Sequence, residues 1–320
     1  VEYSTDGLSL AITYMDATQG WIPTTDDDVT DAPVKLNTEG IFGFGNDGSV
    51  CDITNLVSDA GVVATDVTGV GTARSMLAAC EYGGDKGIFG FGNDGSVTAV
   101  TNLVSNAGVV ASDVTGVGTA RHYLAACSYS ANKDKGIFGF GYSTTNVSIT
   151  NLVSNAGVVA TDTAGVGTTR RGLAACGYGE DKGIFGFGNT GSLTGITNLV
   201  SNTGVVASDV SAVGTARGYL AACDYGGDKG IFGFGDTGSY TGATNLVSNT
   251  GVVSSDVSAV GTAKKELAAC EYGSGKGIFG FGTTGSVTGD TNLVSNTGVV
   301  ATDVTAVGTA RQYLAACSFN

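Results

Sequence analysis

The chain has only one histidine, one tryptophan and two prolines among its 320 residues, and just 14% of them are charged. A single imidazole, that of His122, cannot supply a histidine-based metal cluster or a repeated general base. A Ser-His-Asp triad would depend on the same residue, and the sequence contains no GxSxG nucleophile elbow. We therefore expect a protein that is not an enzyme, with no catalytic residues, no metal site and no cofactor.

Positive charge and long apolar runs are also scarce. Lys and Arg number 15 against 29 Asp and Glu, which gives a net charge of −14. An acidic surface repels phosphate backbones and anionic lipid headgroups. No apolar run approaches the ~18–20 residues that a membrane-spanning helix needs. The sequence therefore predicts neither a nucleic-acid partner nor membrane insertion.

What the sequence has in abundance is repetition. The hexapeptide GIFGFG recurs every 47 residues, except for one step of 49 residues, and the motifs TNLVS and LAAC recur with the same steps. The six copies begin at Gly40, Gly87, Gly136, Gly183, Gly230 and Gly277. They cover residues 40–320 and leave a segment of different character, residues 1–39, in front of them.

Each copy contains four short pieces that are typical of β-strands. In the second hairpin these are residues 74–82, 86–92, 97–105 and 109–114, rich in Val, Thr, Ile and Phe and separated by Gly, Asn and Asp. Helical periodicity is absent. Four antiparallel strands repeated six times predict an all-β fold, a six-bladed β-propeller with four antiparallel strands per blade.

The two ends of the repeat array predict how the ring closes. The first GIFGFG, residues 40–45, has no RxxLAAC strand before it, and the last such strand, residues 311–320, has no GIFGFG after it. We expect the C-terminal strand to pair with the first blade and close the ring. Alternation along GIFGFG should place Phe89 and Phe91 on one face, where Phe of one blade can fill the hollow beside Gly of its neighbour.

Two further residue types recur once per repeat. Six of the seven cysteines occupy equivalent positions, which favours small buried core residues over a thiol ring that binds a soft metal. A cation also recurs, eight residues after an Asp of its own repeat. It could form an anion-binding ring or a buried Asp–Arg pair between blades, and its strict recurrence favours the pair. These cations are Arg74, Arg121, Arg170, Arg217, Lys264 and Arg311.

The copies differ from one another mainly in two places, the pair of residues after the recurring cation and the loop after GIFGFG. In a four-stranded blade both would lie on the same face of the disc. Tyrosine offers apolar area with a polar tip at low entropic cost, so these residues are candidates for recognition of a sugar or a protein. The alternative is sequence drift on an idle surface. The candidate ligand-binding residues are His122, Tyr123, Tyr142, Arg171, Tyr219, Tyr240, Lys265, Glu266, Gln312 and Tyr313.

Two resemblances refine the expectation. The order RxxLAAC, Gly/Asp turn, KGIFGFG resembles the kelch repeat over residues 40–320, although Gly-Phe-Gly replaces the double glycine and the later Tyr and Trp positions are missing. The run DATQGWIP followed by TTDDDVTDAP, and the wording TNLVSNTGVVATDVTGVGTAR, resemble segments of tail-fibre and other virion proteins of tailed phages, particularly marine ones. The acidic run 26–28 is interpreted as a solvated linker rather than a calcium site.

The resemblance to virion appendages implies a location and partners. Residues 1–39 would be an N-terminal β connector, and residues 40–320 a kelch-like propeller on an extracellular virion fibre. Its variable face would contact a host-surface glycan or protein, or another virion protein. An extracellular lectin or adhesin of cellular origin and a purely structural decoration protein remain as alternatives.

Overall fold

The chain divides into two compact units, Val1–Val34 and Lys35–Asn320. The computed structural model describes residues 12–16, 20–23 and 37–320, apart from residues 212, 259 and 306. The acidic run 26–28 lies outside these described residues. In the first unit, β1 (Ile12–Asp16) and β2 (Gly20–Pro23) pair as an antiparallel hairpin.

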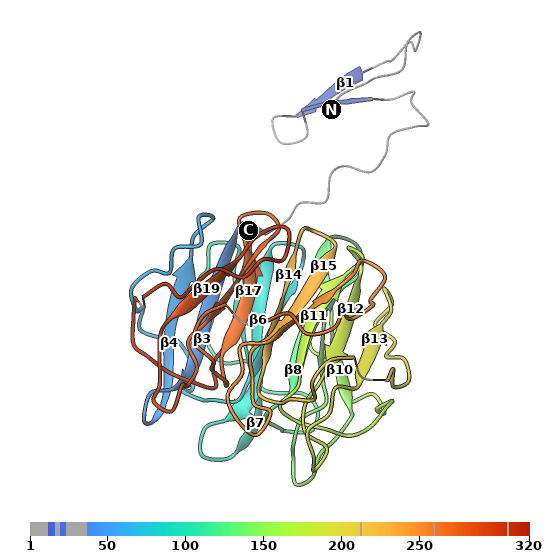
Figure 1. Ribbon diagram of the computed structural model, residues 1–320. Coiled ribbons are helices and arrows are strands. Elements are labelled where there is room, and N and C mark those ends of the chain that lie inside the picture. The colour runs from blue at the N-terminus through green and yellow to red at the C-terminus, as the bar shows by residue number, and fades with distance from the viewer. Residues whose placement is uncertain (1–11, 17–19, 24–36, 212, 259, 306) are drawn as a thin grey trace. The chain divides into compact units, whose positions relative to one another are not determined.

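The second unit is all-β and consists of six three-stranded antiparallel sheets (Figure 1). Its described residues contain no α-helix and a single 3-10 turn, η1 (Ala131–Lys133). No helix in the described part of the chain is long and apolar enough to cross a membrane.

Each sheet contains one strand from a LAAC motif, one from a GIFGFG motif and one from a TNLVS motif. The LAAC motifs form the first strands, which are β5 (Ala78–Tyr82), β8 (Ala125–Tyr129), β11 (Ala174–Tyr178), β14 (Ala221–Tyr225), β17 (Ala268–Tyr272) and β20 (Ala315–Phe319). The GIFGFG motifs form the middle strands, which are β3 (Glu39–Asn46), β6 (Lys86–Asn93), β9 (Lys135–Gly139), β12 (Lys182–Gly186), β15 (Lys229–Gly233) and β18 (Lys276–Gly280). The TNLVS motifs form the third strands, which are β4 (Val50–Val57), β7 (Val97–Val104), β10 (Thr150–Val153), β13 (Thr197–Val200), β16 (Thr244–Val247) and β19 (Thr291–Val294).

The first strands contact one another in order, β5 to β8 and onward to β20, and β20 in turn contacts β5. The sheets stay separate from each other, and each one is open at its edges. The C-terminal strand β20 pairs with β3, with Cys317 opposite Ile41 and Phe319 opposite Glu39. The predicted pairing of the last strand with the 40–45 strand is therefore confirmed.

The prediction of four strands per repeat is wrong, because the fourth piece does not form a strand. In the second repeat, the backbone of segment 109–114 pairs with β7 only through isolated bridges at Val110 and Val114, and the register slips by one residue between them. The side chain of Asn102 enters this gap and donates from Nδ2 to the carbonyl oxygen of Ala111 at 3.0 Å. A side chain thus takes an acceptor that a continuous ladder would have given to backbone N–H groups.

The core lies between the sheets, and glycines make room for it. A Cβ placed on Gly90 would lie 2.7 Å from Cζ of Phe138 in the next sheet, so only glycine fits there. The expectation that Phe89 and Phe91 share a face is wrong. A bulge between Gly90 and Gly92, with Phe91 at φ 64°, turns Phe91 to the opposite face from Phe89.

Candidate functional site

The six first strands surround a central space, here called the channel, and a closed ring of backbone hydrogen bonds frames one end of it. One residue of each repeat donates its N–H to the carbonyl of the equivalent residue in the preceding repeat, at 2.7–2.9 Å, and Met76 completes the circle by donating to Tyr313. All six residues have positive φ. They are Met76, Tyr123, Gly172, Tyr219, Glu266 and Tyr313. These six residues are the second of the two variable residues that follow each recurring cation. The ring of hydrogen bonds, here called the frame, holds their side chains around the mouth of the channel.

The tyrosines of this frame pack together over a small cavity. The ring centroid of Tyr123 lies 5.5 Å from that of Tyr219 and 5.6 Å from that of Tyr313, both edge to face. This cavity, of about 70 Å³, is lined by these tyrosines and by the leucine of each LAAC motif. A second cavity, of about 110 Å³, lies among the LAAC motifs of all six repeats. Burial raises the pKa of Tyr313, and its hydrogen bonds with Tyr123 and Glu266 raise it further.

The first of the two variable residues after each recurring cation lies beside the variable loop that follows GIFGFG. Isolated bridges join His122 to Tyr142, Lys265 to Thr283 and Gln312 to Asn46. The structure therefore brings the two variable sets of the sequence to the same end of the channel. Gln312 joins the group only through its backbone bridge, whereas the other candidate residues also contact one another through side chains.

Lys265 is surrounded by carboxylates and aromatic rings. Its Nζ lies 2.8 Å from Asp236 Oδ2 and 3.6 Å from Glu266 Oε1. It also lies 5.6 Å from the ring centroid of Tyr219 and 5.3 Å from that of Tyr240. Burial raises the pKa of Glu266, although the hydrogen bond from Tyr313 and the charge of Lys265 oppose this. The lysine is thus held by charges of its own chain.

The only histidine lies on the other side of the same mouth. Its ring centroid is 4.8 Å from Tyr123 and 5.6 Å from Tyr142, and Cζ of Arg171 lies 4.7 Å from the Tyr142 centroid. Burial lowers the pKa of His122, and the nearby charge of Arg171 lowers it further. Both effects favour the neutral form of the imidazole.

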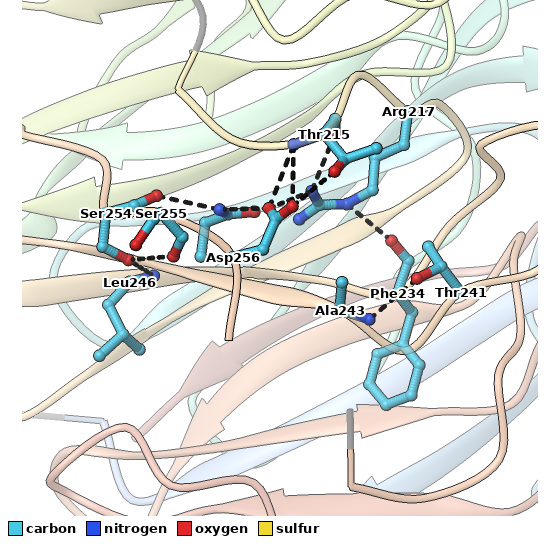
Figure 2. Close-up of polar contacts among 10 residues, drawn as sticks. Thr215, Arg217, Phe234, Thr241, Ala243, Leu246, Ser254, Ser255 and Asp256 are labelled. Atoms are coloured by element: carbon cyan, nitrogen blue, oxygen red, sulfur yellow. Dashed lines mark hydrogen bonds and ion pairs between the residues drawn. The ribbon is translucent and has the colours of Figure 1, made fainter. Parts of the chain in front are cut away.

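The recurring cations are not available to a ligand. Arg217 is fully buried, with its Cζ 4.2 Å from the Phe187 ring centroid and its Nε donating to the carbonyl of Phe234 at 2.9 Å. Figure 2 shows this guanidinium beside Thr215 and Asp256: its Nη1 donates to the Thr215 carbonyl at 3.3 Å and lies 3.8 Å from Asp256 Oδ1. The carboxylate belongs to the following repeat, not to the cation's own repeat as expected. Burial excludes the anion-binding ring and supports a structural pair between repeats.

The opposite end of the channel holds a charge cluster that the sequence reasoning missed. Lys133, on η1, places Nζ 2.7 Å from Asp224 Oδ2 and 2.5 Å from Glu271 Oε2. Ser128 donates to Glu81 Oε2 at 2.6 Å beside them. The two extra residues of the 49-residue step, which form the loop around η1, were the signal that could have pointed to this insertion.

The cysteines belong to the core. All seven are free and buried, and burial raises the pKa of each thiol, which disfavours the thiolate form that binds metals or attacks substrates. Within the described residues, no group of three or more His, Cys, Asp or Glu side chains is arranged to hold a metal ion. A comparison with protein-family models gives no match, and no curated protein matches the sequence.

Proposed function

We propose that residues 40–320 form a six-bladed, kelch-like β-propeller that acts as a non-enzymatic recognition module. The succession of contacts between the first strands and the pairing of β20 with β3 support this architecture. In it, the segment after each third strand takes the place of an outer strand, reduced to two bridges. Residues 1–39 serve as a β connector to another module.

The binding surface in this proposal is the variable face at the tyrosine-lined mouth. The observation that carries it is that the variable side chains gather on a backbone arrangement that is the same in every repeat. The backbone ring and the buried cations repeat around the channel, while the side chains that they present differ from repeat to repeat. Aromatic rings with polar tips, set beside charged groups, suit a glycan or a protein surface.

We place the module on an extracellular virion fibre of a tailed phage, following the resemblance of its repeats. Its partners would be a host-surface glycan or protein, and other virion proteins. Single contacts of this kind are weak, and repetition of the module on an oligomeric fibre would raise the overall avidity.

The test is binding of the purified chain to a glycan array and to candidate host cells. A variant with Tyr123→Ala, Tyr219→Ala and Tyr313→Ala should lose binding. Val205→Ala, at an exposed position in the turns of the opposite end, should keep it. Absence of any binding by correctly folded protein would contradict recognition and favour a structural decoration.

A further inference from the structure

The two half-buried cations of the variable face, Arg171 and Lys265, differ in their partners. Lys265 has two carboxylates within 4 Å. Arg171 has none among the described residues, and its guanidinium instead stacks on the ring of Tyr142. A stacked guanidinium keeps its edge free for a bidentate contact with an anion.

Unpartnered polar atoms collect around Arg171. Its own Nε is buried without a hydrogen-bond partner, and so are Nδ1 of His122 and Oδ1 of Asn146. The Asn146 amide is held in place because its Nδ2 donates to the carbonyl of Asn189 at 3.1 Å. Buried polar atoms cost free energy unless they are hydrogen-bonded, so this set is suited to a ligand that supplies the missing partners.

The loops on either side of Arg171 carry no acid. Residues 142–147 read YSTTNV and residues 189–194 read NTGSLT, whereas other repeats place Asp47, Asp94 or Asp236 in the same loop. The two loops that flank Arg171 therefore contribute no negative charge to this site, although the chain as a whole is acidic.

From these observations we infer that the corner formed by His122, Tyr142, Asn146 and Arg171 binds the anionic group of an acidic sugar. This inference rests on the proposed function and names its ligand class. The Arg171 guanidinium receives the carboxylate or phosphate. Tyr142, whose ring lies against this guanidinium, and Tyr123, which packs against His122, offer apolar surface to the sugar ring. The neutral imidazole of His122 and the Asn146 carbonyl offer hydrogen bonds to hydroxyl groups.

The experiment measures binding of the full chain to two pairs of polysaccharides. One pair is polygalacturonate and its carboxyl-reduced, neutral form. The other is phosphomannan and the same mannan after removal of its phosphate. We expect binding to at least one acidic member, weakening as salt rises, and little binding to its neutral counterpart. Comparison of the pairs distinguishes a carboxylate from a phosphate ligand.

The chain supplies substitutions that its own fold accepts. Arg171→Gly introduces the residue found at the equivalent position of the next repeat, Gly218. It should weaken binding to the acidic polysaccharide by about tenfold or more, as expected for loss of hydrogen bonds to a charged group. The matched control Lys182→Gln removes one exposed positive charge at the opposite end and should leave binding unchanged.

Two results would overturn the assignment. In the first, the chain binds the acidic and neutral forms with equal affinity, Arg171→Gly has no effect, and the triple tyrosine variant no longer binds. This result would support recognition by the variable face but contradict an anionic ligand. Failure of the folded chain to bind any glycan or host cell would instead remove the proposed function itself. Circular dichroism of each variant checks that the β-fold is present before binding is compared.

Discussion

The recurring cation shows how a buried charge is tolerated at a single residue. Each arginine lies over a phenylalanine ring, donates Nε to a backbone carbonyl and faces an Asp of the following repeat. Burial lowers the pKa of Arg217 to about 10, which still leaves it charged at pH 7. The Asp supplies the opposite charge, although the shortest distance between Arg217 Nη1 and Asp256 Oδ1 is 3.8 Å, too long for a hydrogen bond.

Lys264 is the exception in this set and gives the first prediction. Its Nζ donates to the carbonyl of Asp290 at 2.9 Å, and burial lowers its pKa to about 8. Lys264→Arg restores the guanidinium fork of the other repeats and should stabilise the protein by about 1 kcal/mol at pH 7.

The gain from Lys264→Arg should depend on pH in a defined direction. Because the pKa of Lys264 is lower in the folded chain than its usual 10.5, the wild type gains stability as the pH rises from about 8 toward 10.5. The advantage of the variant should therefore shrink over that range, as measured by urea unfolding at pH 7 and pH 9.5. An advantage that grows with pH would contradict the burial of a charged lysine.

At the scale of the strand, small residues and a bulge decide the packing. Gly90 of β6 leaves a hollow that Phe138 of the neighbouring sheet fills, and the same contact recurs around the molecule. Gly90→Ala should destabilise the protein by about 1–3 kcal/mol, because the added methyl group meets a ring held in a packed core.

The relief of this clash provides the matched test. Phe138→Leu shortens the side chain that meets the new methyl group and alone should also be destabilising. In the double variant the two losses should be less than additive, by about 0.5 kcal/mol or more. Chemical unfolding of the wild type, both single variants and the double variant measures this coupling. Strict additivity would show that the glycine is needed for another reason.

The sequence predicts the strands well but not their irregularities. Alternation and turn residues identify the three paired strands of each repeat, since backbone ladders follow directly from these patterns. The bulge at Phe91 and the side-chain bond from Asn102 cannot be read from alternation, because both depend on where a neighbouring segment lies. For the same reason the recurring Asp was assigned to the Arg of its own repeat, although it faces the Arg of the preceding one.

The candidate site was foreseeable to a similar extent. Differences among repeats identify the variable residues, and the structure gathers them at one end of the channel. Their pairing could not be predicted, because the sequence of one repeat does not say which side chain of the next repeat it meets. Lys265 and Arg171 look alike in the sequence, yet only Lys265 has carboxylate partners among the described residues.

Across the whole molecule, contacts between repeats hold the array together. Asp256 accepts hydrogen bonds from the backbone and hydroxyl of Thr215 in the preceding repeat and from Asn245. Burial would raise the pKa of this carboxyl, but these hydrogen bonds outweigh it and lower the pKa. Such a group stabilises the fold above its usual pKa of 3.8, and this contribution is lost as the pH falls through the lower folded pKa.

Another of these connections is the Lys133 cluster, which joins η1 to Asp224 of β14 and Glu271 of β17. Lys133→Met removes the cation between Asp224 and Glu271 and leaves two carboxylates uncompensated. Removing one partner of a buried ion pair typically costs about 3–5 kcal/mol. We expect a loss of this size at pH 8, whereas Lys182→Met, which breaks a surface pair, should cost less than about 1 kcal/mol.

The loss caused by Lys133→Met should depend on pH. Burial raises the pKa of Glu271 from 4.5 to about 7 despite the lysine, and removal of the lysine raises it further. A raised folded pKa gives stability that is present at low pH and disappears as the pH rises through that pKa. The thermal midpoint of the variant should therefore approach that of the wild type at pH 5 and fall away toward pH 8. An equal deficit at both pH values would mean that lost packing around η1, rather than uncompensated carboxylate charge, destabilises the variant.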